Sequence, residues 1–213
     1  MPGSETALKE LVCKVLGDHL QAGFVSKLAD DLYCEGNTQE ELLQNWISVM
    51  SALNDCGLTL TAGKIIICPR STTILGWILT RGRLSASPHK VSVLSTCKLP
   101  DTVHGLRSFI VAYKMLSRFL PSCSHTIAPL ESAISGLQSK DKIKWSEELI
   151  ENFNIAQSKL KDSKEIYLPR RDDHLWIITD GSVSKCEIGA TLYIMCDDKV
   201  RLAGFFSAEL RKH

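Results

Sequence analysis

The spacing of hydrophobic residues changes along this chain, and each change constrains the fold. Residues 5–21 and 38–56 carry apolar side chains at helical spacing, on either side of a short alternating segment at 24–34. From Pro88 onward the spacing is helical again. From Leu175 every second residue is apolar, which is typical of strands. A chain of 213 residues is long enough to form a hydrophobic core. Its content of 44% hydrophobic and 23% charged residues is ordinary for a globular protein. The pattern predicts an α+β protein.

Several residues mark where the helices of the first part begin and end. Thr38 and Glu41 form the Thr-x-x-Glu pattern of a capping box, which predicts a helix that starts here and stops at Gly57. Gly23 is expected to end the helix 5–21. The second helix should turn one apolar stripe inward, made of Leu42, Leu43, Trp46, Ile47, Met50 and Leu53.

Two strands are expected next, at 64–68 and 73–79, joined by a Pro-Arg-Ser turn. Four helices should then follow in the middle of the chain, the third of them a shorter one at about 125–136. Pro88 suits the first position of the first helix, Asp101 is predicted to cap the second, and Ser146 is predicted to start the fourth.

The end of the chain predicts a three-stranded antiparallel meander with strands at 175–179, 188–195 and 200–206. Gly181-Ser182 and Asp197-Asp198 are turn residues between these strands. Each tryptophan of the chain lies inside an apolar pattern and is interpreted as a core anchor; these are Trp46, Trp77, Trp145 and Trp176.

The composition excludes several classes of protein. A formal net charge of +1 gives no general attraction to a polyanion, so nucleic-acid binding would need a local patch. The 8 cysteines form no C-x-x-C pair, which favours reduced thiols in an intracellular protein, cytoplasmic or nuclear. The N-terminus is not a secretory signal. The most apolar run, 65–79, is interrupted by Pro69, Arg70 and Gly76, so no membrane span is predicted.

Asp30 and Asp31 stand between two short apolar runs and are expected at the tip of a hairpin. Adjacent carboxylates repel each other, and a hard divalent cation relieves the repulsion. Magnesium prefers a few carboxylates together with waters and substrate phosphates, which suits phosphoryl transfer. Aspartate is also a common turn residue, and the doublet taken alone favours a plain turn.

The doublet is one of several short motifs that follow each other in a fixed order. It stands in Leu28-Ala29-Asp30-Asp31, and each later motif is weak by itself. The later motifs are Gly57-Leu58-x-Leu60 with Lys64, Ile74-Leu75-Gly76, Leu106-Arg107-Ser108-Phe109-Ile110, Ala128-Pro129-Leu130, and Thr179-Asp180-Gly181-Ser182 with Gly189-Ala190.

In this order and spacing the motifs resemble the reverse transcriptase and ribonuclease H region of long-terminal-repeat retroelements, the gypsy-like class, over nearly the whole chain. The family usually has Tyr or Phe where Leu28 stands. The resemblance implies that Asp30 and Asp31 are catalytic ligands of Mg2+ in a polymerase site. It also implies that Asp180 is a catalytic ligand of a second, ribonuclease H site.

The resemblance further implies binding of an RNA/DNA primer–template duplex and of deoxynucleotides. Lys64 would lie near the nucleotide phosphates, and Gly76 with Trp77 would form the turn that grips the primer. Basic side chains along one face of an expected helix at 102–119 would contact phosphates, although a solvated helix face has the same pattern. This basic stripe consists of His104, Arg107, Lys114 and Arg118.

The expected function is therefore that of a retroelement polymerase fragment with a ribonuclease H-like segment. Further acidic strands are expected upstream and downstream, in the remainder of a polyprotein, so both sites should be incomplete in this chain. A non-catalytic nucleic-acid-binding remnant and a decayed fragment without selected function remain as alternatives. The expected parts are a palm remnant at 1–84, a helical thumb at 85–137, a connection at 138–168 and a ribonuclease-H-like start at 169–213.

Overall fold

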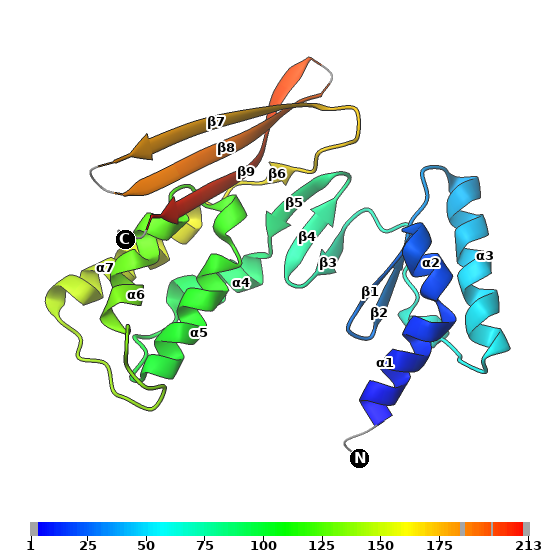
Figure 1. Cartoon of the computed structure of the whole chain (residues 1–213), viewed down its shortest axis with the longest axis horizontal. Coiled ribbons are helices and arrows are strands. Elements are labelled where there is room, and N and C mark those ends of the chain that lie inside the picture. The colour runs from blue at the N-terminus through cyan, green and yellow to red at the C-terminus, as the bar shows by residue number, and fades with distance from the viewer. Residues whose placement is uncertain (1–3, 184–185, 197, 211–213) are drawn as a thin grey trace. The chain divides into compact units, whose positions relative to one another are not determined.

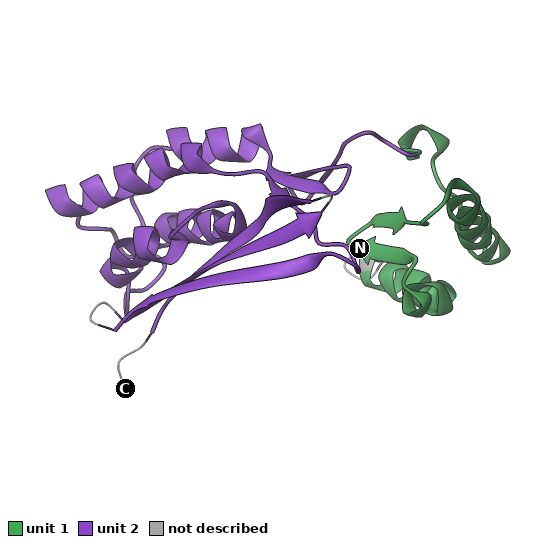
Figure 2. Ribbon diagram, turned by 90° about the horizontal axis from the view of Figure 1, so that it is seen from above, with its two compact units in different colours: residues 1–67 green, residues 68–213 purple. Residues whose placement is uncertain are grey.

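The computed structural model describes residues 4–183, 186–196 and 198–210 (Figure 1). The chain divides into two compact units, Met1–Ile67 and Cys68–His213 (Figure 2). Both units combine helices with antiparallel strands, which confirms the predicted α+β class. The palm, thumb, connection and ribonuclease-H-like limits stay predictions. No helix within the described ranges is long and apolar enough to cross a membrane.

The first unit surrounds a small core with helices and one hairpin. Its core contains Leu16, Val25, Val49 and Leu53, all buried. The elements in chain order are α1 (Ser4–Val15), α2 (Gly17–Ala22), β1 (Val25–Leu28), β2 (Asp31–Cys34), α3 (Gln39–Asp55) and the 3-10 helix η1 (Ala62–Lys64).

The start of α3 confirms the predicted capping box. The Thr38 hydroxyl accepts a hydrogen bond from the Glu41 amide at 3.1 Å. The Glu41 carboxylate in turn accepts from the Asn37 amide at 2.7 Å. The first bond satisfies an amide that a helix start leaves without a partner inside the helix, and the second ties Glu41 to the residue before the N-cap instead of to Thr38 itself. Gly57, with φ of +71°, follows the helix as predicted.

Two predictions for this unit are wrong. The helix expected at 5–21 is split, because Leu16 leaves helical geometry between α1 and α2 and buries its side chain in the core. The apolar stripe of α3 is narrower than expected, since Leu43 and Ile47 are 58% and 57% exposed while Val49 is buried. The core of this unit is too small to cover both sides of the stripe.

The second unit begins with a four-stranded antiparallel sheet in the order β3-β4-β5-β6. Its strands are β3 (Thr72–Ile74), β4 (Trp77–Thr80), β5 (Arg83–Ala86) and β6 (Ile166–Tyr167). The single strand expected at 73–79 is thus a hairpin that turns at Leu75 and Gly76. The strand expected at 64–68 does not form, and Ile66 and Ile67 are exposed there. No partner strand lies beside it within the described residues, and a strand without a partner leaves its peptide groups unpaired.

A helical layer provides the main core of the second unit. It consists of α4 (Pro88–Thr96), α5 (Val103–Lys114), η2 (Ser117–Phe119), α6 (Cys123–Ala133), α7 (Glu147–Lys159) and η3 (Leu160–Asp162). Phe109 of α5 and Phe153 of α7 pack with ring centroids 4.6 Å apart. Burial raises the pKa of the Cys123 thiol to about 11 and also raises the pKa of the Tyr113 hydroxyl.

The helix starts of this layer agree with the sequence in two places out of three. Pro88 begins α4, and Ser146 caps α7 by accepting a hydrogen bond from the Leu149 amide. The predicted cap at Asp101 is wrong, because the Thr102 hydroxyl accepts from the Gly105 amide instead. The helix expected to reach residue 119 ends at Lys114.

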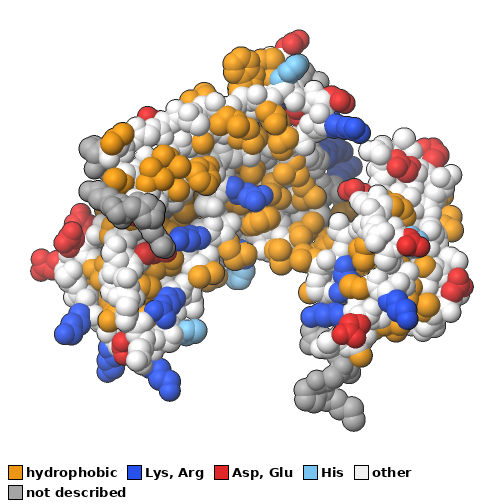
Figure 3. Space-filling view, in the orientation of Figure 1, with side chains coloured by type: hydrophobic (Ala, Val, Ile, Leu, Met, Phe, Trp, Pro, Cys, Tyr) orange, Lys and Arg blue, Asp and Glu red, His pale blue; other side chains and the backbone are white. Residues whose placement is uncertain are grey.

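The predicted meander is confirmed as a three-stranded antiparallel sheet of β7 (His174–Ser182), β8 (Glu187–Cys196) and β9 (Lys199–Glu209). The prediction that Gly181 and Ser182 form a turn is wrong, because both belong to β7, and Asp197 of the other predicted turn lies outside the described residues. Figure 3 shows hydrophobic side chains gathered over the part of the molecule where Figure 1 draws this sheet. β7 is a sheet edge whose apolar residues are exposed on both faces, including Ile177 at 67% and Trp176 at 58%. The prediction that Trp176 anchors the core is therefore wrong.

Candidate functional site

The aspartate doublet lies at the tip of the β1–β2 hairpin, as predicted. Leu28 pairs with Asp31 at the end of the ladder, so Ala29 and Asp30 form the turn. Both aspartates are exposed. Ala29 has φ of +50°, and its carbonyl oxygen accepts a hydrogen bond from Lys27 Nζ at 2.5 Å. The turn therefore leaves two adjacent carboxylates open to solvent.

This arrangement fits part of a magnesium site. Two carboxylates suit Mg2+, which keeps waters and substrate oxygens in the rest of its shell. Within the described residues no group of three or more His, Cys, Asp or Glu side chains lies close enough to hold a metal ion. As metal ligands, the two carboxylates of the doublet would supply only part of the coordination shell.

Lys64 ends η1 in the same unit as the doublet, and its side chain is exposed. Asp180 lies in the other unit, near the C-terminal end of β7 and opposite Gly189. Its Oδ1 accepts a hydrogen bond from the amide of Gly181 at 2.9 Å. Asp180 is exposed, so its second carboxylate oxygen faces solvent.

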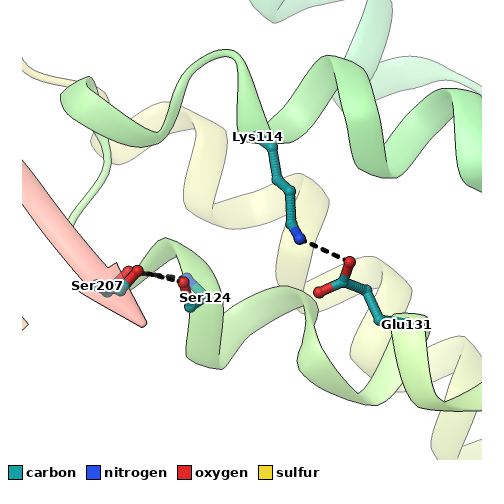
Figure 4. Close-up of polar contacts among 4 residues, drawn as sticks. All are labelled: Lys114, Ser124, Glu131 and Ser207. Carbon is teal, nitrogen blue, oxygen red and sulfur yellow. Dashed lines mark hydrogen bonds and ion pairs between the residues drawn. The ribbon is translucent and has the colours of Figure 1, made fainter. Parts of the chain in front are cut away.

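A shallow cavity of about 160 Å3 adjoins Asp180 and includes residues that the sequence did not indicate. His125 of α6 pairs with Glu187 of β8, with Nδ1 and Oε1 2.7 Å apart. Ser124 of α6 bonds to Ser207 of β9 (Figure 4). These pairs join residues far apart in sequence, and no local spacing could have predicted them.

The turn between β3 and β4 has the tight geometry expected of Gly76. Leu75 and Gly76 have φ of +52° and +75°. Lys90 Nζ donates a hydrogen bond to the Leu75 carbonyl at 2.6 Å, and the Ser87 amide donates to the Gly76 carbonyl at 3.1 Å. A Cβ at Gly76 would lie 2.3 Å from Lys90 Cε. Glycine is therefore required here by both conformation and space.

Trp77 links this turn to the helical layer. Its ring meets Phe119 edge to face, with centroids 6.0 Å apart. The Arg118 guanidinium carbon lies 4.9 Å from the centroid of the Trp77 ring. Trp77 is half-buried, and its Nε1 is buried without an acceptor among the described residues.

The residues of the predicted basic stripe lie on two different elements, and two of their side chains already form hydrogen bonds to other residues of the chain. Arg107 donates to the Leu137 carbonyl at 2.7 Å and to Ser139 Oγ at 3.1 Å. Lys114 Nζ lies 2.6 Å from Glu131 Oε1 (Figure 4). Arg118 belongs to η2 rather than to α5, while His104 is exposed on the first turn of α5. A phosphate would have to compete with these internal contacts.

Comparisons with known proteins agree with the order of motifs. No protein-family model matches the chain. The chain is 24% identical over 143 residues to the Gag-Pol polyprotein of avian reticuloendotheliosis virus, which covers 67% of this chain and 12% of the relative. It is 24% identical over 191 residues to a retrovirus-related Pol polyprotein from transposon opus of Drosophila melanogaster, covering 86% of this chain and 19% of the relative.

Solved structures share the fold. The foamy viral protease-reverse transcriptase in complex with dsDNA covers 98% of this chain with a TM-score of 0.76 and 20% identity, and the chain spans 42% of it. The same kind of protein in complex with an RNA/DNA hybrid gives a TM-score of 0.73 and 20% identity over 96% of this chain and 27% of that one. The chain thus has an α+β fold found in reverse transcriptase structures and is similar to a region of Pol polyproteins. It spans less than a fifth of the curated relatives described above.

Proposed function

We propose that the chain is a segment of the reverse transcriptase and ribonuclease H region of a gypsy-like retroelement, and that it supplies the Asp30-Asp31 hairpin to a polymerase magnesium site. The observation that carries this proposal is the open pair of carboxylates at a two-residue turn. The order of the other motifs and the similarity to Pol polyproteins support it.

In this proposal Asp30 and Asp31 hold magnesium, which when bound would neutralise charge on the phosphoryl group being transferred. Lys64 contacts the deoxynucleotide phosphates, and Gly76 and Trp77 position the primer. Asp180 is one ligand of the ribonuclease H site. Because two carboxylates fill only part of a metal shell, we propose that the chain is catalytically incomplete by itself.

The same proposal assigns the parts of the chain by resemblance. Residues 1–84 are the end of the palm, 85–137 the thumb, 138–168 the connection and 169–213 the start of a ribonuclease-H-like domain.

Metal binding tests the central claim. Mn2+ added to the isotope-labelled chain should broaden the amide signals around Ala29–Leu32, because a bound paramagnetic ion relaxes nearby nuclei. Mg2+ should reverse the broadening by competition. The Asp30→Asn/Asp31→Asn variant should lose the effect, whereas Asp55→Asn, which removes an exposed acid from the end of α3, should keep it. Equal broadening in both variants would remove the metal assignment.

Primer extension tests the activity. The chain alone should extend a primer on an RNA template no faster than the background, since its ligand set is partial. Any extension that does occur should be abolished by Asp30→Asn. Extension clearly above the background, at the same rate by the chain and by Asp30→Asn, would contradict the role of the doublet.

A second candidate function is nucleic-acid binding without catalysis. It is favoured by the partial ligand set together with the fold shared with duplex-bound reverse transcriptases. Affinity for an RNA–DNA hybrid should then fall steeply with salt, and Arg107→Ala/Lys114→Ala should reduce the slope of log affinity against log salt by about one to two units. An unchanged slope would exclude the basic stripe as the contact surface.

A decayed fragment is the remaining candidate. The uncovered apolar residues of edge strand β7 favour it, because exposed flat edges promote association between chains. Light scattering at increasing concentration should then show growing particles. A monomer with a sharp thermal transition would argue against decay.

A further inference from the structure

The second unit contains a cavity of about 310 Å3 that the proposed polymerase and ribonuclease H sites do not use. Four arginines line it: Arg81 from the β4–β5 turn, Arg83 from the start of β5, Arg170 from the segment after β6, and Arg201 from β9. The fold thus gathers guanidinium groups from three separate parts of the chain around one hollow.

The guanidinium of Arg201 lies against an aromatic ring, and its Nε has no acceptor among the described residues. Its guanidinium carbon lies 4.6 Å from the centroid of the Tyr167 ring, which also lines the cavity. Its Nε is buried and donates to no acceptor among the described residues. Because Nε is buried, an anion in the cavity would accept from the Nη hydrogens of the same guanidinium, whose plane the Tyr167 ring positions.

The other charges at the cavity leave an excess of positive charge. Arg83 is paired with Glu165, with Nη1 and Oε2 2.9 Å apart. Asp173 is the acidic residue of the lining, and its Oδ2 already accepts from the Arg170 amide at 2.8 Å. Two carboxylates therefore face four guanidinium groups.

The tight β4–β5 turn fixes the backbone position of Arg81. Arg81 and Gly82 have φ of +43° and +77°, the pattern of a tight two-residue hairpin. The Leu168 amide donates to the Gly82 carbonyl at 2.8 Å, which ties this turn to the segment that carries Arg170. Both arginines thus stand on backbone that is held together by a hydrogen bond.

We propose that this cavity binds a phosphate group through Arg81, Arg170 and Arg201. The planar guanidinium fork matches phosphate oxygens in pairs, which a point charge such as lysine does not. The natural bearer would be a phosphodiester of the nucleic-acid backbone. That identification rests on the function proposed above, whereas the anion site does not depend on it.

Inorganic pyrophosphate is the probe for the site itself. The side-chain Nε–H signals of the arginines should shift in a saturable way during titration. Arg170→Gln should weaken binding about tenfold, since a charge-assisted hydrogen bond is lost. The matched control is Arg171→Gln, which removes the same charge from the next residue, outside the lining, and should change the affinity less than about twofold. Arg81→Gln provides a second variant, on an exposed turn residue whose loss should not disturb folding.

Absence of saturation, or equal weakening in Arg170→Gln and Arg171→Gln, would overturn the anion site. A short RNA–DNA hybrid separates the two possible sources of phosphate. Displacement of pyrophosphate by the hybrid supports a backbone phosphodiester as the ligand. If the hybrid does not displace bound pyrophosphate, the anion site is supported and its ligand is a small phosphate compound. Hybrid binding without pyrophosphate binding overturns the cavity proposal and leaves the function proposed above standing.

Discussion

The β1–β2 and β3–β4 hairpins have similar turns and very different surroundings. Each has a two-residue turn whose first residue is not glycine and has a positive φ, +50° at Ala29 and +52° at Leu75. The β3–β4 turn is held by Lys90 and Ser87 from the start of α4. The β1–β2 turn is contacted by Lys27 of its own strand. One turn is built into its unit, and the other presents its carboxylates to solvent.

This difference separates two kinds of candidate site residue. The geometry of Gly76 is fixed by its neighbours, so its substitution should affect folding first. Asp30 and Asp31 have no such neighbours among the contacts described, so their substitution should affect ligand binding while leaving folding intact. The following changes test that contrast, from the largest expected effect to the smallest.

Gly76→Ala should lower the free energy of unfolding of the second unit by about 2–3 kcal/mol. A left-handed conformation costs an alanine about 1–2 kcal/mol, and the new Cβ would displace the Lys90 side chain. Gly136→Ala is the matched control, because Gly136 has the same φ of +75° with nothing within 4 Å of the added Cβ. Urea unfolding measures both. Equal losses would show that the Lys90 contact contributes nothing.

Lys90→Met should lower the same free energy by about 1 kcal/mol, because it removes a charged donor from the Leu75 carbonyl while keeping the length of the side chain. Lys98→Met, on an exposed lysine of the same region, should have little effect. Adding Gly76→Ala to Lys90→Met should cost less than the sum of the two changes, since the clash is already relieved. If the two losses of stability simply add, the Lys90 side chain does not hold the β3–β4 turn as proposed.

Ala29→Gly should raise the stability of the first unit by about 0.5 kcal/mol. Glycine adopts the left-handed conformation without steric cost, and part of that gain is offset by its greater freedom in the unfolded chain. Ala7→Gly, within α1, should have the opposite sign because glycine weakens helices. Urea unfolding followed at residues of the first unit distinguishes the two. A loss of stability in Ala29→Gly would mean that the turn is not strained.

Asp30→Asn/Asp31→Asn should leave the unfolding midpoint of the first unit unchanged in metal-free buffer. Both side chains are exposed at the tip, and their neutral amides keep the same shape. Circular dichroism during urea titration measures this. A lowered midpoint would show that the doublet is a structural turn, and the contrast between the two hairpins would fail.

The elements that the sequence predicted correctly are those with local determinants. Thr38 with Glu41, Pro88 and Ser146 act within one turn of helix, and the alternation of β7 to β9 is visible within each strand. The predictions failed where the expected structure depends on another segment that pairs with it or covers it. Among the described residues the run at 64–68 has no neighbouring strand, and Trp176, which is 58% exposed, is left largely uncovered.

The candidate sites follow the same rule. The exposed turn of Asp30 and Asp31 could be predicted because apolar runs flank it directly. The contact between Lys90 and Leu75 could not be predicted, nor could the gathering of Arg81, Arg170 and Arg201. Each depends on how distant segments meet, and no residue spacing encodes that meeting.

The stacking of Arg118 on Trp77 has a mechanical consequence. Trp77 is the first residue of β4, directly after the Gly76 turn, while Arg118 belongs to η2 at the end of the helix–turn that follows α5. The contact between the guanidinium and the indole therefore joins the sheet to the helical layer. Removing the guanidinium would expose more of the indole ring and loosen the tie between the start of β4 and η2.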